Sequence, residues 1–296
     1  MLFTGASGFL GLNILPLLLK DYATDTIGLS DKDTYNVDLS ENIIKLNRSY
    51  DLVLHAAGKA HVIPKNKYEN EEFYKVNYQG TVNLCKSLEK VGVPKSFIFI
   101  STVAVYGIEK GLGITEEHEL LGSTPYALSK IMAENYLKKW CKRNNVVLGI
   151  LRPSLIAGKN PPGNLGKMIE GIRKGQYFNV RKGKARKSIL MAEDIAILIP
   201  KIAKVGGVYN ICDNHHPSFN ELGKMISNQL KKRPPISIPY WLAKSVAILG
   251  DIFEGKIPLN SVRLEKMVNS LTFSNEKAKK QLNWEPLDVL ANFKIY

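Results

Sequence analysis

A glycine-rich turn lies between a short apolar run and an apolar helical pattern at the start of the chain. The segment Thr4-Gly5-Ala6-Ser7-Gly8-Phe9-Leu10-Gly11 has a glycine at every third position from Gly5. Glycine lets the backbone turn tightly and lets a diphosphate approach it, and the N-terminus of the next helix offers free N–H groups to the phosphates. The segment therefore predicts a dinucleotide-binding turn between a strand at Met1–Thr4 and a helix at Phe9–Lys20. A merely structural turn is the alternative.

The first half of the chain alternates apolar runs with helical patterns. The strand-like runs are Thr26–Leu29, Leu52–His55, Phe97–Ser101 and Val146–Leu151, and the helical patterns are Glu72–Val91 and Pro125–Asn144. This alternation predicts an α/β fold, a Rossmann-type doubly wound parallel sheet, to which Gly207–Cys212 returns. We expect the dinucleotide-binding domain at 1–157 and about 186–215, and a smaller C-terminal lobe at 158–185 and 216–296.

An acidic residue follows the second predicted strand. Asp31 lies 20 residues after Gly11, the spacing at which a carboxylate binds the adenosine ribose hydroxyls and favours NAD. Ser30 and Lys32 flank it and would accommodate a 2′-phosphate, so NADP stays open. Asp38 is a candidate for the adenine edge or, alternatively, a carboxylate at a helix N-terminus.

A tyrosine and a lysine share one face of a predicted helix. Tyr126 and Lys130 are four residues apart. A phenol with a pKa near 10 is a poor base at neutral pH, but a neighbouring ammonium and a positive nicotinamide ring favour the phenolate. Tyr126 is therefore a candidate general acid and base, whereas an exposed helix pair is the structural alternative.

The charge balance biases the chain toward anionic partners. It has 41 Lys and Arg against 27 Asp and Glu, a net charge of +14. The segment 159–187 alone contributes +8, because nine basic residues face one Glu. No basic motif interleaved with aromatic residues is present, so we expect no nucleic-acid partner. Ile238–Phe253 is apolar and predicts either a buried, groove-lining helix or an interfacial membrane helix.

The cysteines and the apolar segments indicate a compartment. The three cysteines are widely spaced without a C-x-x-C pair, which predicts neither a disulfide framework nor a metal site and fits a reducing cytosol. No signal peptide is visible, and no apolar run is long enough to span a bilayer. We expect a cytoplasmic protein, with peripheral contact at the inner membrane face as the alternative.

Together these motifs resemble the extended short-chain dehydrogenases/reductases, and within them the NAD-dependent sugar epimerase/dehydratase family, over nearly the whole chain. The matching segments are Thr4–Gly11, Leu54–Gly58, Val76–Thr81, Phe97–Gly107, Leu151–Pro153 and Leu282–Pro286, the last with Asn283 in place of a glycine. The resemblance implies that the C-terminal lobe binds the substrate.

The resemblance also assigns candidate site residues. Cofactor contacts are expected from Gly5, Ser7, Gly8, Phe9, Leu10, Gly11, Asp31, Asp38, Leu39, His55, Ala56, Ala57, Ser101, Tyr126, Lys130 and Pro153. The implied catalytic set is Thr102, Tyr126, Lys130 and Asn77, and the substrate contacts are Thr102, Asn164 and Arg186. Arginine suits a diphosphate because its forked donors match the phosphate oxygens.

The resemblance implies a reaction class. In the 4,6-dehydratase branch an Asp-Glu pair follows the catalytic Thr, but here Val103 and Ala104 stand there, so no 4,6-dehydratase activity is expected. What remains is an NAD(P)-dependent 4-epimerase or 4-keto reductase of a nucleotide sugar, of the UDP-N-acetylhexosamine type, in surface polysaccharide synthesis. The alternatives are a catalytically silent NAD(P)-binding regulator and a reductase of a lipid-linked sugar. A homodimer through the helices with Asn77 and Tyr126 is a further expectation.

Overall fold

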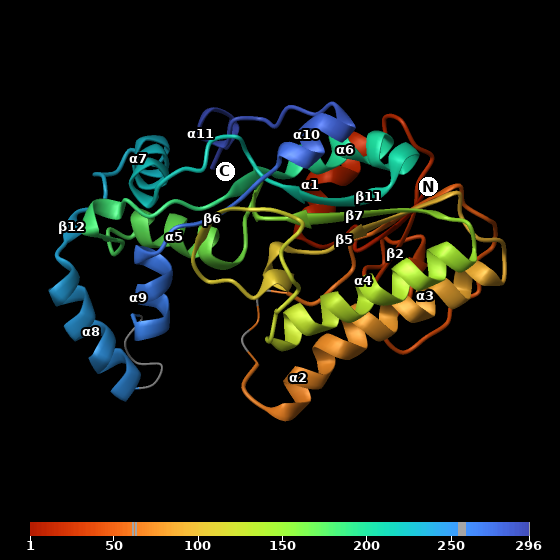
Figure 1. The fold of residues 1–296 in the computed structure, drawn as a ribbon, viewed down its shortest axis with the longest axis horizontal. Coiled ribbons are helices and arrows are strands. Elements are labelled where there is room, and N and C mark those ends of the chain that lie inside the picture. The colour runs from red at the N-terminus through yellow and green to blue at the C-terminus, as the bar shows by residue number, and fades with distance from the viewer. Residues whose placement is uncertain (61, 63, 254–258, 296) are drawn as a thin grey trace.

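A computed structural model describes residues 1–60, 62, 64–253 and 259–295 (Figure 1). Its centre is a seven-stranded sheet in the order β11-β7-β5-β4-β1-β2-β3, with every neighbouring pair parallel. The strands are β1 (Leu2–Thr4), β2 (Asp25–Gly28), β3 (Tyr35–Asn36), β4 (Leu52–His55), β5 (Ser96–Ile100), β7 (Val147–Pro153) and β11 (Gly207–Ile211). The chain winds outward in both directions from β1 and β4, which confirms the predicted Rossmann-type sheet.

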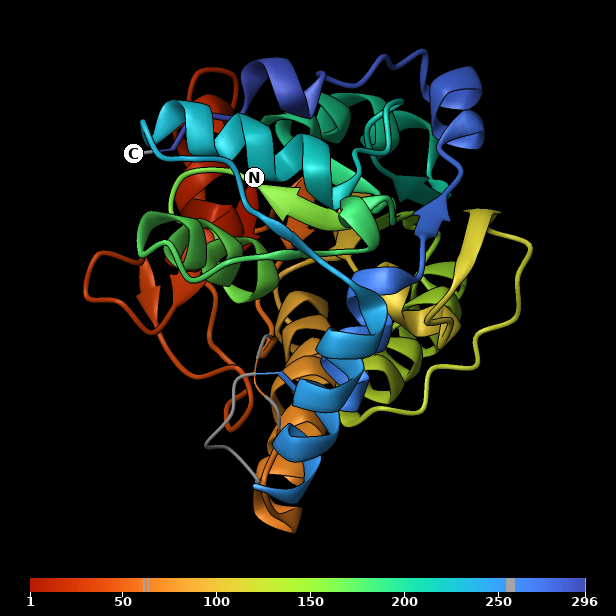
Figure 2. The same ribbon diagram turned by 90° about the vertical axis from the view of Figure 1, so that its left-hand side faces the viewer.

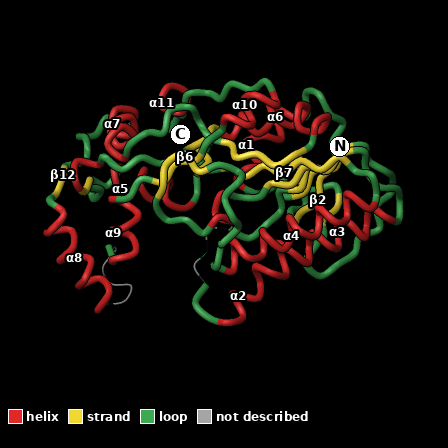
Figure 3. The backbone as a smooth tube through the Cα atoms, in the orientation of Figure 1, coloured by secondary structure: helices red, strands yellow, loops and turns green. Residues whose placement is uncertain are grey.

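Helices cover both faces of this sheet (Figure 3). They are α1 (Phe9–Leu18), α6 (Ala192–Val205) and α10 (Glu276–Leu282) on one face, and α3 (Gly80–Glu89) and α4 (Pro125–Arg143) on the other. Successive residues of a strand point to opposite faces of the sheet: Ile98 packs against the first group of helices and Phe97 against the second. Because both faces are buried, the strands read as continuous apolar runs in the sequence.

A second lobe extends from the carboxyl end of the sheet (Figures 1 and 2). It contains α5 (Gly163–Arg173), α7 (Phe219–Gln229), α8 (Tyr240–Ile252), α9 (Ser261–Val268) and α11 (Val289–Asn292). Three parallel strand pairs accompany it: β8 (Leu155–Ala157) with β10 (Ile189–Met191), β9 (Asn179–Val180) with β12 (Ser237–Ile238), and β6 (Gly111–Ile114) with β13 (Leu271–Phe273). None of the described helices is both long and apolar enough to cross a membrane.

Two regions differ from the expected elements. The predicted helix Glu72–Val91 is divided into α2 (Lys67–Phe73), a π-helical segment (Tyr74–Gln79) and α3. In addition, Ala278, Leu282 and Trp284 pack into the α1 and α6 layer, so part of 216–296 lies against the central sheet. The predicted domain boundaries stay a prediction.

Candidate active site

The turn between β1 and α1 brings its backbone against the neighbouring strand. Gly5 has a φ of +79°, and a Cβ there would lie 2.6 Å from the nitrogen of Ala57. A Cβ at Gly11 would lie 2.3 Å from the carbonyl oxygen of Ala6. Gly8 is the N-cap of α1, and no side chain caps its first turn. The turn therefore needs glycine at positions 5 and 11, and it leaves the helix N-terminus open to a diphosphate.

A cavity of about 260 Å³ lies over this turn, at the carboxyl ends of β1, β5 and β7. Open parallel sheets bind ligands at such a point, where the strand order reverses. The predicted residues that line the cavity are Gly5, Gly8, Phe9, Leu10, Ala56, Ser101, Thr102, Tyr126, Lys130 and Pro153. The glycine turn and the Tyr-Lys pair thus face one space, which fits a dinucleotide lying between them.

The predicted ribose contact lies outside the cavity wall. Asp31 is exposed, and its carboxylate accepts a hydrogen bond of 2.8 Å from the side-chain amide of Asn36. A different carboxylate closes the end of β2, because Asp33 accepts a hydrogen bond of 3.1 Å from the backbone N–H of Ser30. The ribose contact of Asp31 stays a prediction.

The remaining predicted cofactor contacts are spread around the cavity without lining it. Asp38 is exposed and accepts from the backbone N–H of Ser40 at 2.8 Å, as a turn residue does. Leu39 is buried and packs in the layer formed with α3 and α4. Ser7, Gly11 and Ala57 belong to or adjoin the glycine turn. Their cofactor roles stay predictions.

His55 lies behind the cavity in a chain of buried hydrogen bonds. Ala57 N–H donates to Thr4 Oγ1 at 3.2 Å, and the Thr4 hydroxyl lies 2.6 Å from His55 Nδ1. On the other side, His55 Nε2 lies 2.9 Å from Thr81 Oγ1, whose hydroxyl donates to the carbonyl of Asn77. Since the Thr81 proton is already used, Nε2 must donate and Nδ1 must accept. The structure therefore joins the glycine turn to the π-helical segment through His55.

Burial keeps this imidazole neutral. Desolvation, with the nearby Lys130 ammonium as the smaller cause, lowers the pKa of His55 to about 3. A neutral ring with one donor and one acceptor is the form that the hydrogen-bond chain requires.

Asn77 connects the strand side of the cavity to helix α4. It is fully buried in the π-helical segment, and its Oδ1 accepts from Lys59 N–H at 2.7 Å. Its Nδ2 donates to the Lys59 carbonyl and, at 2.9 Å, to Ser129 Oγ. Ser129 in turn donates to the carbonyl of Tyr126. Asn77 is thus linked through Ser129 to the backbone of Tyr126, and its supporting role in catalysis stays a prediction.

Helix α4 presents Tyr126 and Lys130 to the cavity together. Thr124 caps the helix by accepting from Ala127 N–H at 3.2 Å, and the four-residue spacing then places both side chains on one face. The Lys130 ammonium donates to the carbonyl of Ile100 at 2.9 Å and lies 4.6 Å from the centre of the Phe99 ring.

The electrostatics of the pair differ from the sequence expectation. Burial raises the pKa of Tyr126, and a hydrogen bond with Thr102 only partly offsets this. Burial also lowers the pKa of Lys130 to about 8, against a smaller opposing effect of Glu134. The chain's own residues therefore hold Tyr126 protonated, and the phenolate needs more positive charge in the cavity than Lys130 supplies.

A buried ion pair beneath the site escaped the sequence reasoning. Glu134 and Arg152 form two hydrogen bonds, at 2.6 and 3.0 Å, and their side chains are 0% and 3% exposed. Ser101 donates to the same carboxylate at 2.6 Å, and Arg152 donates to the hydroxyl of Tyr106, which donates to Asn210. The sequence signal was available, because Glu134 follows Lys130 by one helical turn.

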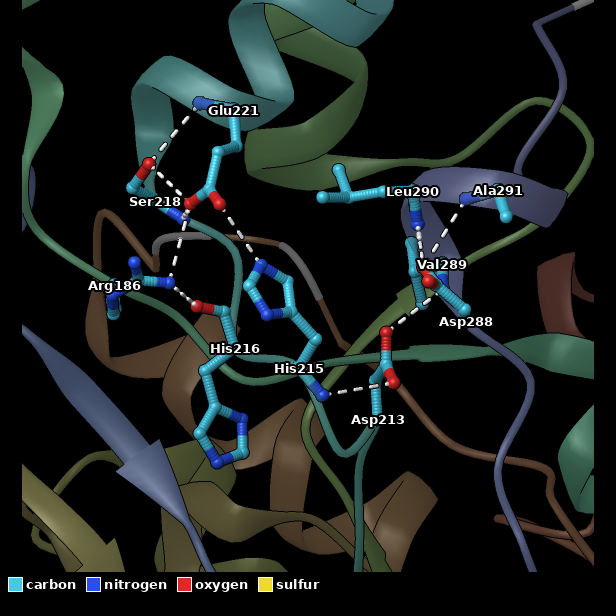
Figure 4. A network of polar contacts seen from close by, with 10 residues as sticks. All are labelled: Arg186, Asp213, His215, His216, Ser218, Glu221, Asp288, Val289, Leu290 and Ala291. Carbon is cyan, nitrogen blue, oxygen red and sulfur yellow. Dashed lines mark hydrogen bonds and ion pairs between the residues drawn. The ribbon is translucent and has the colours of Figure 1, made fainter.

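The predicted diphosphate contacts lie elsewhere. The Arg186 guanidinium donates to the carbonyl of His216 at 2.7 Å and pairs with Glu221 at 3.3 Å, and Glu221 also contacts His215 (Figure 4). Asn164 is exposed near the N-terminus of α5. Neither side chain lines the cavity described above, so their substrate roles stay predictions.

Two further positions bear on the chemistry. Val103 and Ala104 begin a 3₁₀ turn (Val103–Tyr106) directly after Thr102, so no carboxylate follows the threonine there. Ser154 lines the cavity, and its hydroxyl is buried without a hydrogen-bond partner among the described residues. Sequence reasoning had no signal for Ser154 beyond its place after Pro153.

The parallel sheet, the glycine turn and the Tyr-Lys pair define a Rossmann-type dinucleotide-binding enzyme. The family model described as NAD dependent epimerase/dehydratase family matches residues 1–212, and the chain belongs to that family. The resemblance seen in the sequence is thereby confirmed, as is NAD as the cofactor of the family.

Individual relatives agree with this assignment. The chain is 29% identical to N-acetyl-alpha-D-glucosaminyl-diphospho-ditrans,octacis-undecaprenol 4-epimerase of Escherichia coli O157:H7, over 94% of this chain and 88% of the relative. It is 28% identical to UDP-glucose 4-epimerase of Vibrio cholerae, over 98% and 92%. A structure of UDP-glucose 4-epimerase from Thermotoga maritima has a TM-score of 0.77 at 21% identity, covering 99% of this chain and 96% of that one.

Proposed function

We propose that this protein is an NAD-dependent 4-epimerase of a nucleotide-linked hexose, with a UDP-N-acetylhexosamine as substrate, in surface polysaccharide synthesis. The observation that carries the proposal is that Thr102 and Tyr126 line the same cavity as Gly5 and Gly8. The relatives from E. coli and V. cholerae, both named as 4-epimerases, support C4 as the reacting carbon.

The residues of the chain divide the proton work. NAD, when bound, supplies reversible acceptance of the hydride from C4. Tyr126 takes the C4 hydroxyl proton as general base and returns it as general acid after the sugar has turned its other face. Thr102, hydrogen-bonded to Tyr126, holds the same sugar oxygen. Asn77 keeps the start of α4 in place through Ser129 and the backbone of Tyr126.

Lys130 supplies a positive charge behind the tyrosine. Its pKa of about 8 leaves the ammonium protonated at neutral pH, where it favours the phenolate form of Tyr126. Val103 and Ala104 offer no acid or base for loss of water, so dehydration is not part of the proposed reaction.

A lipid-linked sugar is the second candidate substrate. The E. coli relative is named for N-acetylglucosamine on diphospho-undecaprenol, and it aligns with 94% of this chain. The ring chemistry at C4 would be the same, and only the group beyond the diphosphate would differ. A 4-keto reductase and a catalytically silent NAD(P)-binding regulator remain the alternatives. The family resemblance also supports a cytoplasmic homodimer joined through the helices that carry Asn77 and Tyr126.

The test is inversion at C4 of UDP-N-acetylglucosamine and, separately, of its polyprenyl-diphosphate counterpart, followed by NMR with the purified protein. Tyr126→Phe removes the general acid and base, so turnover should fall by about 10²- to 10⁴-fold. Tyr136→Phe is the matched control, because Tyr136 lies on the same helix but does not line the cavity.

Full turnover of Tyr126→Phe would contradict the assignment. Inversion of neither sugar by a protein that has bound NAD would favour the regulator. Net reduction of a 4-keto sugar with consumption of the reduced cofactor would favour the reductase.

A further inference from the structure

Helix α8 carries its large apolar side chains on the outside. Ala243, Ala247 and Gly250 face inward and are buried. Six exposed apolar residues, here named the α8 stripe, lie on the remaining surface: Trp241, Leu242, Ile248, Leu249, Ile252 and Phe253. A helix on a water-soluble domain normally turns its apolar side inward. Apolar exposure of this extent on one helix marks a contact with another surface.

The apolar residues of the stripe form two groups on one face of the helix, with the exposed Lys244 and Ser245 between them. Trp241, Ile248 and Ile252 are spaced by seven and four residues, which places them on one line, and Leu242, Leu249 and Phe253 repeat the spacing one residue on. In two perpendicular views α8 extends away from the lobe (Figures 1 and 2). The stripe is therefore a ridge on a projecting helix, a shape suited to a soft surface more than to a protein pocket.

Three cations lie on or near the N-terminal part of α8. The Arg181 guanidinium lies 4.3 Å from the centre of the Tyr240 ring at the start of α8. Lys182 is exposed and joined to β12 by the bond from its N–H to Ser237 Oγ, and Lys244 is exposed on α8 itself. Among the described residues none of these three side chains has an acidic partner.

The acidic residue of α8 does not oppose these cations. Asp251 is occupied by the backbone N–H and the hydroxyl of Ser261 on α9, which fixes it toward the neighbouring helix. Among the described residues, the charged side chains of α8 and of the segment 181–182 that have no hydrogen-bond or ion-pair partner are therefore all cationic.

We propose that α8 docks the protein on the surface of an anionic bilayer. The α8 stripe would enter the boundary between headgroups and acyl chains, with Trp241 at the interface, as in interfacial amphipathic helices. Arg181, Lys182 and Lys244 would meet the lipid phosphates. A second copy of the chain fits less well, because a twofold contact would bring the same three cations together.

The docking would place the active site beside the membrane. The Phe73 ring of α2 lies 6.2 Å from the Tyr126 ring, and α2 extends in the same direction as α8 in both views (Figures 1 and 2). This consequence for a lipid-linked sugar rests on the proposed function. The docking itself does not, because vesicle binding is measured without substrate.

The test is co-sedimentation of the full chain with vesicles of phosphatidylcholine alone and of phosphatidylcholine with about one third phosphatidylglycerol, which supplies the negative surface potential. We expect binding to the anionic vesicles that weakens with salt. Trp241→Ser/Ile248→Ser/Ile252→Ser should lower the partition coefficient about a hundredfold. Leu112→Ser/Leu121→Ser, which removes exposed apolar side chains elsewhere, should leave it unchanged.

Tryptophan fluorescence gives an independent readout. Trp140 and Trp284 are each 2% exposed, whereas Trp241 is 69% exposed, so a blue shift on adding vesicles reports Trp241. In Trp241→Phe the shift should vanish while binding persists.

Several outcomes would overturn the proposal. These are absence of binding at low salt, equal binding by the triple serine variant, or Trp241 emission that vesicles leave unchanged. If the protein does not bind vesicles but changes from dimer to monomer in the triple serine variant, the stripe is instead a contact with a second copy of the chain. None of these outcomes bears on the C4 inversion assay, so the docking proposal and the proposed function can fail independently.

Discussion

In the seven-stranded half of the molecule polar groups lie inside, whereas on α8 apolar groups lie outside. Arg152 is 3% exposed and is paired with Glu134, while the side chain of Trp241 is 69% exposed to solvent. The buried polar groups near the active site are held by partners from distant parts of the chain, so they fix geometry. The exposed apolar side chains of α8 do not hold other parts of the described chain in place. The difference indicates that the first region builds a site and the second offers a surface.

The largest expected effect concerns the buried ion pair. Arg152→Leu would leave the Glu134 carboxylate buried without its bidentate partner, which costs about 3–5 kcal/mol of unfolding free energy. The measurement is urea unfolding followed by circular dichroism.

The same carboxylate offers a matched control. Lys138 lies 3.8 Å from Glu134, but its side chain is 43% exposed. Lys138→Met should change the unfolding free energy by less than about 0.5 kcal/mol. Equal losses of unfolding free energy in the two variants would show that burial does not determine the strength of the ion pairs of Glu134.

An intermediate effect is expected from His55. Its pKa is about 3 in the folded protein against an ordinary value of 6.5, so between these values the unfolded chain binds more protons. The contribution of His55 to the unfolding free energy must therefore fall as the pH falls below about 6.5, by about 2 kcal/mol between pH 7 and pH 5. Burial raises the pKa of Asp194 to about 7, which acts in the opposite direction over this range, so the variant is compared with the parent. In His55→Gln this contribution should be absent, so the variant loses less stability than the parent over the same range.

His55→Gln also alters the hydrogen bonds to Thr4 and Thr81, which shifts the unfolding free energy at both pH values. The measurement is therefore the difference in unfolding free energy between pH 7 and pH 5 within each protein. His118→Gln, at an exposed histidine, is the control and should show the same change of unfolding free energy as the parent protein. An identical loss in His55→Gln and the parent would show that His55 is not held neutral.

Much of the first region could be predicted because its signals are local. The buried strands appear as apolar runs, and the predicted run Leu52–His55 coincides with β4. A spacing of four residues suffices to place Tyr126 and Lys130 together, since the helix geometry does the rest. The glycine turn is equally local, because the strand, turn and helix follow one another directly.

What could not be predicted depends on distant partners. The hydrogen bonds that draw His55 behind the cavity come from Thr4 and Thr81, which are 51 and 26 residues away. Arg186 turns toward Glu221, 35 residues away, and not toward the cavity. The sequence left open whether Ile238–Phe253 is buried or interfacial, since the pattern shows an apolar helix without showing which side meets the lobe. The structure provides that side, through Ala243 and Ala247.

The smallest expected effect tests whether the α8 stripe contributes to folding. Trp241→Ser removes a whole indole, yet we expect the unfolding free energy to change by less than about 0.5 kcal/mol because the ring is largely in solvent. Gly250→Ala adds one methyl group on the opposite side of the same helix. Its Cβ would lie 1.8 Å from the carbonyl oxygen of Leu259, so about 1–3 kcal/mol should be lost. Thermal unfolding of the two variants compares the faces directly. A large loss of unfolding free energy in Trp241→Ser would mean that the indole stabilises the lobe. The α8 stripe would then contribute to folding, as the buried polar groups do, and would not be a free surface.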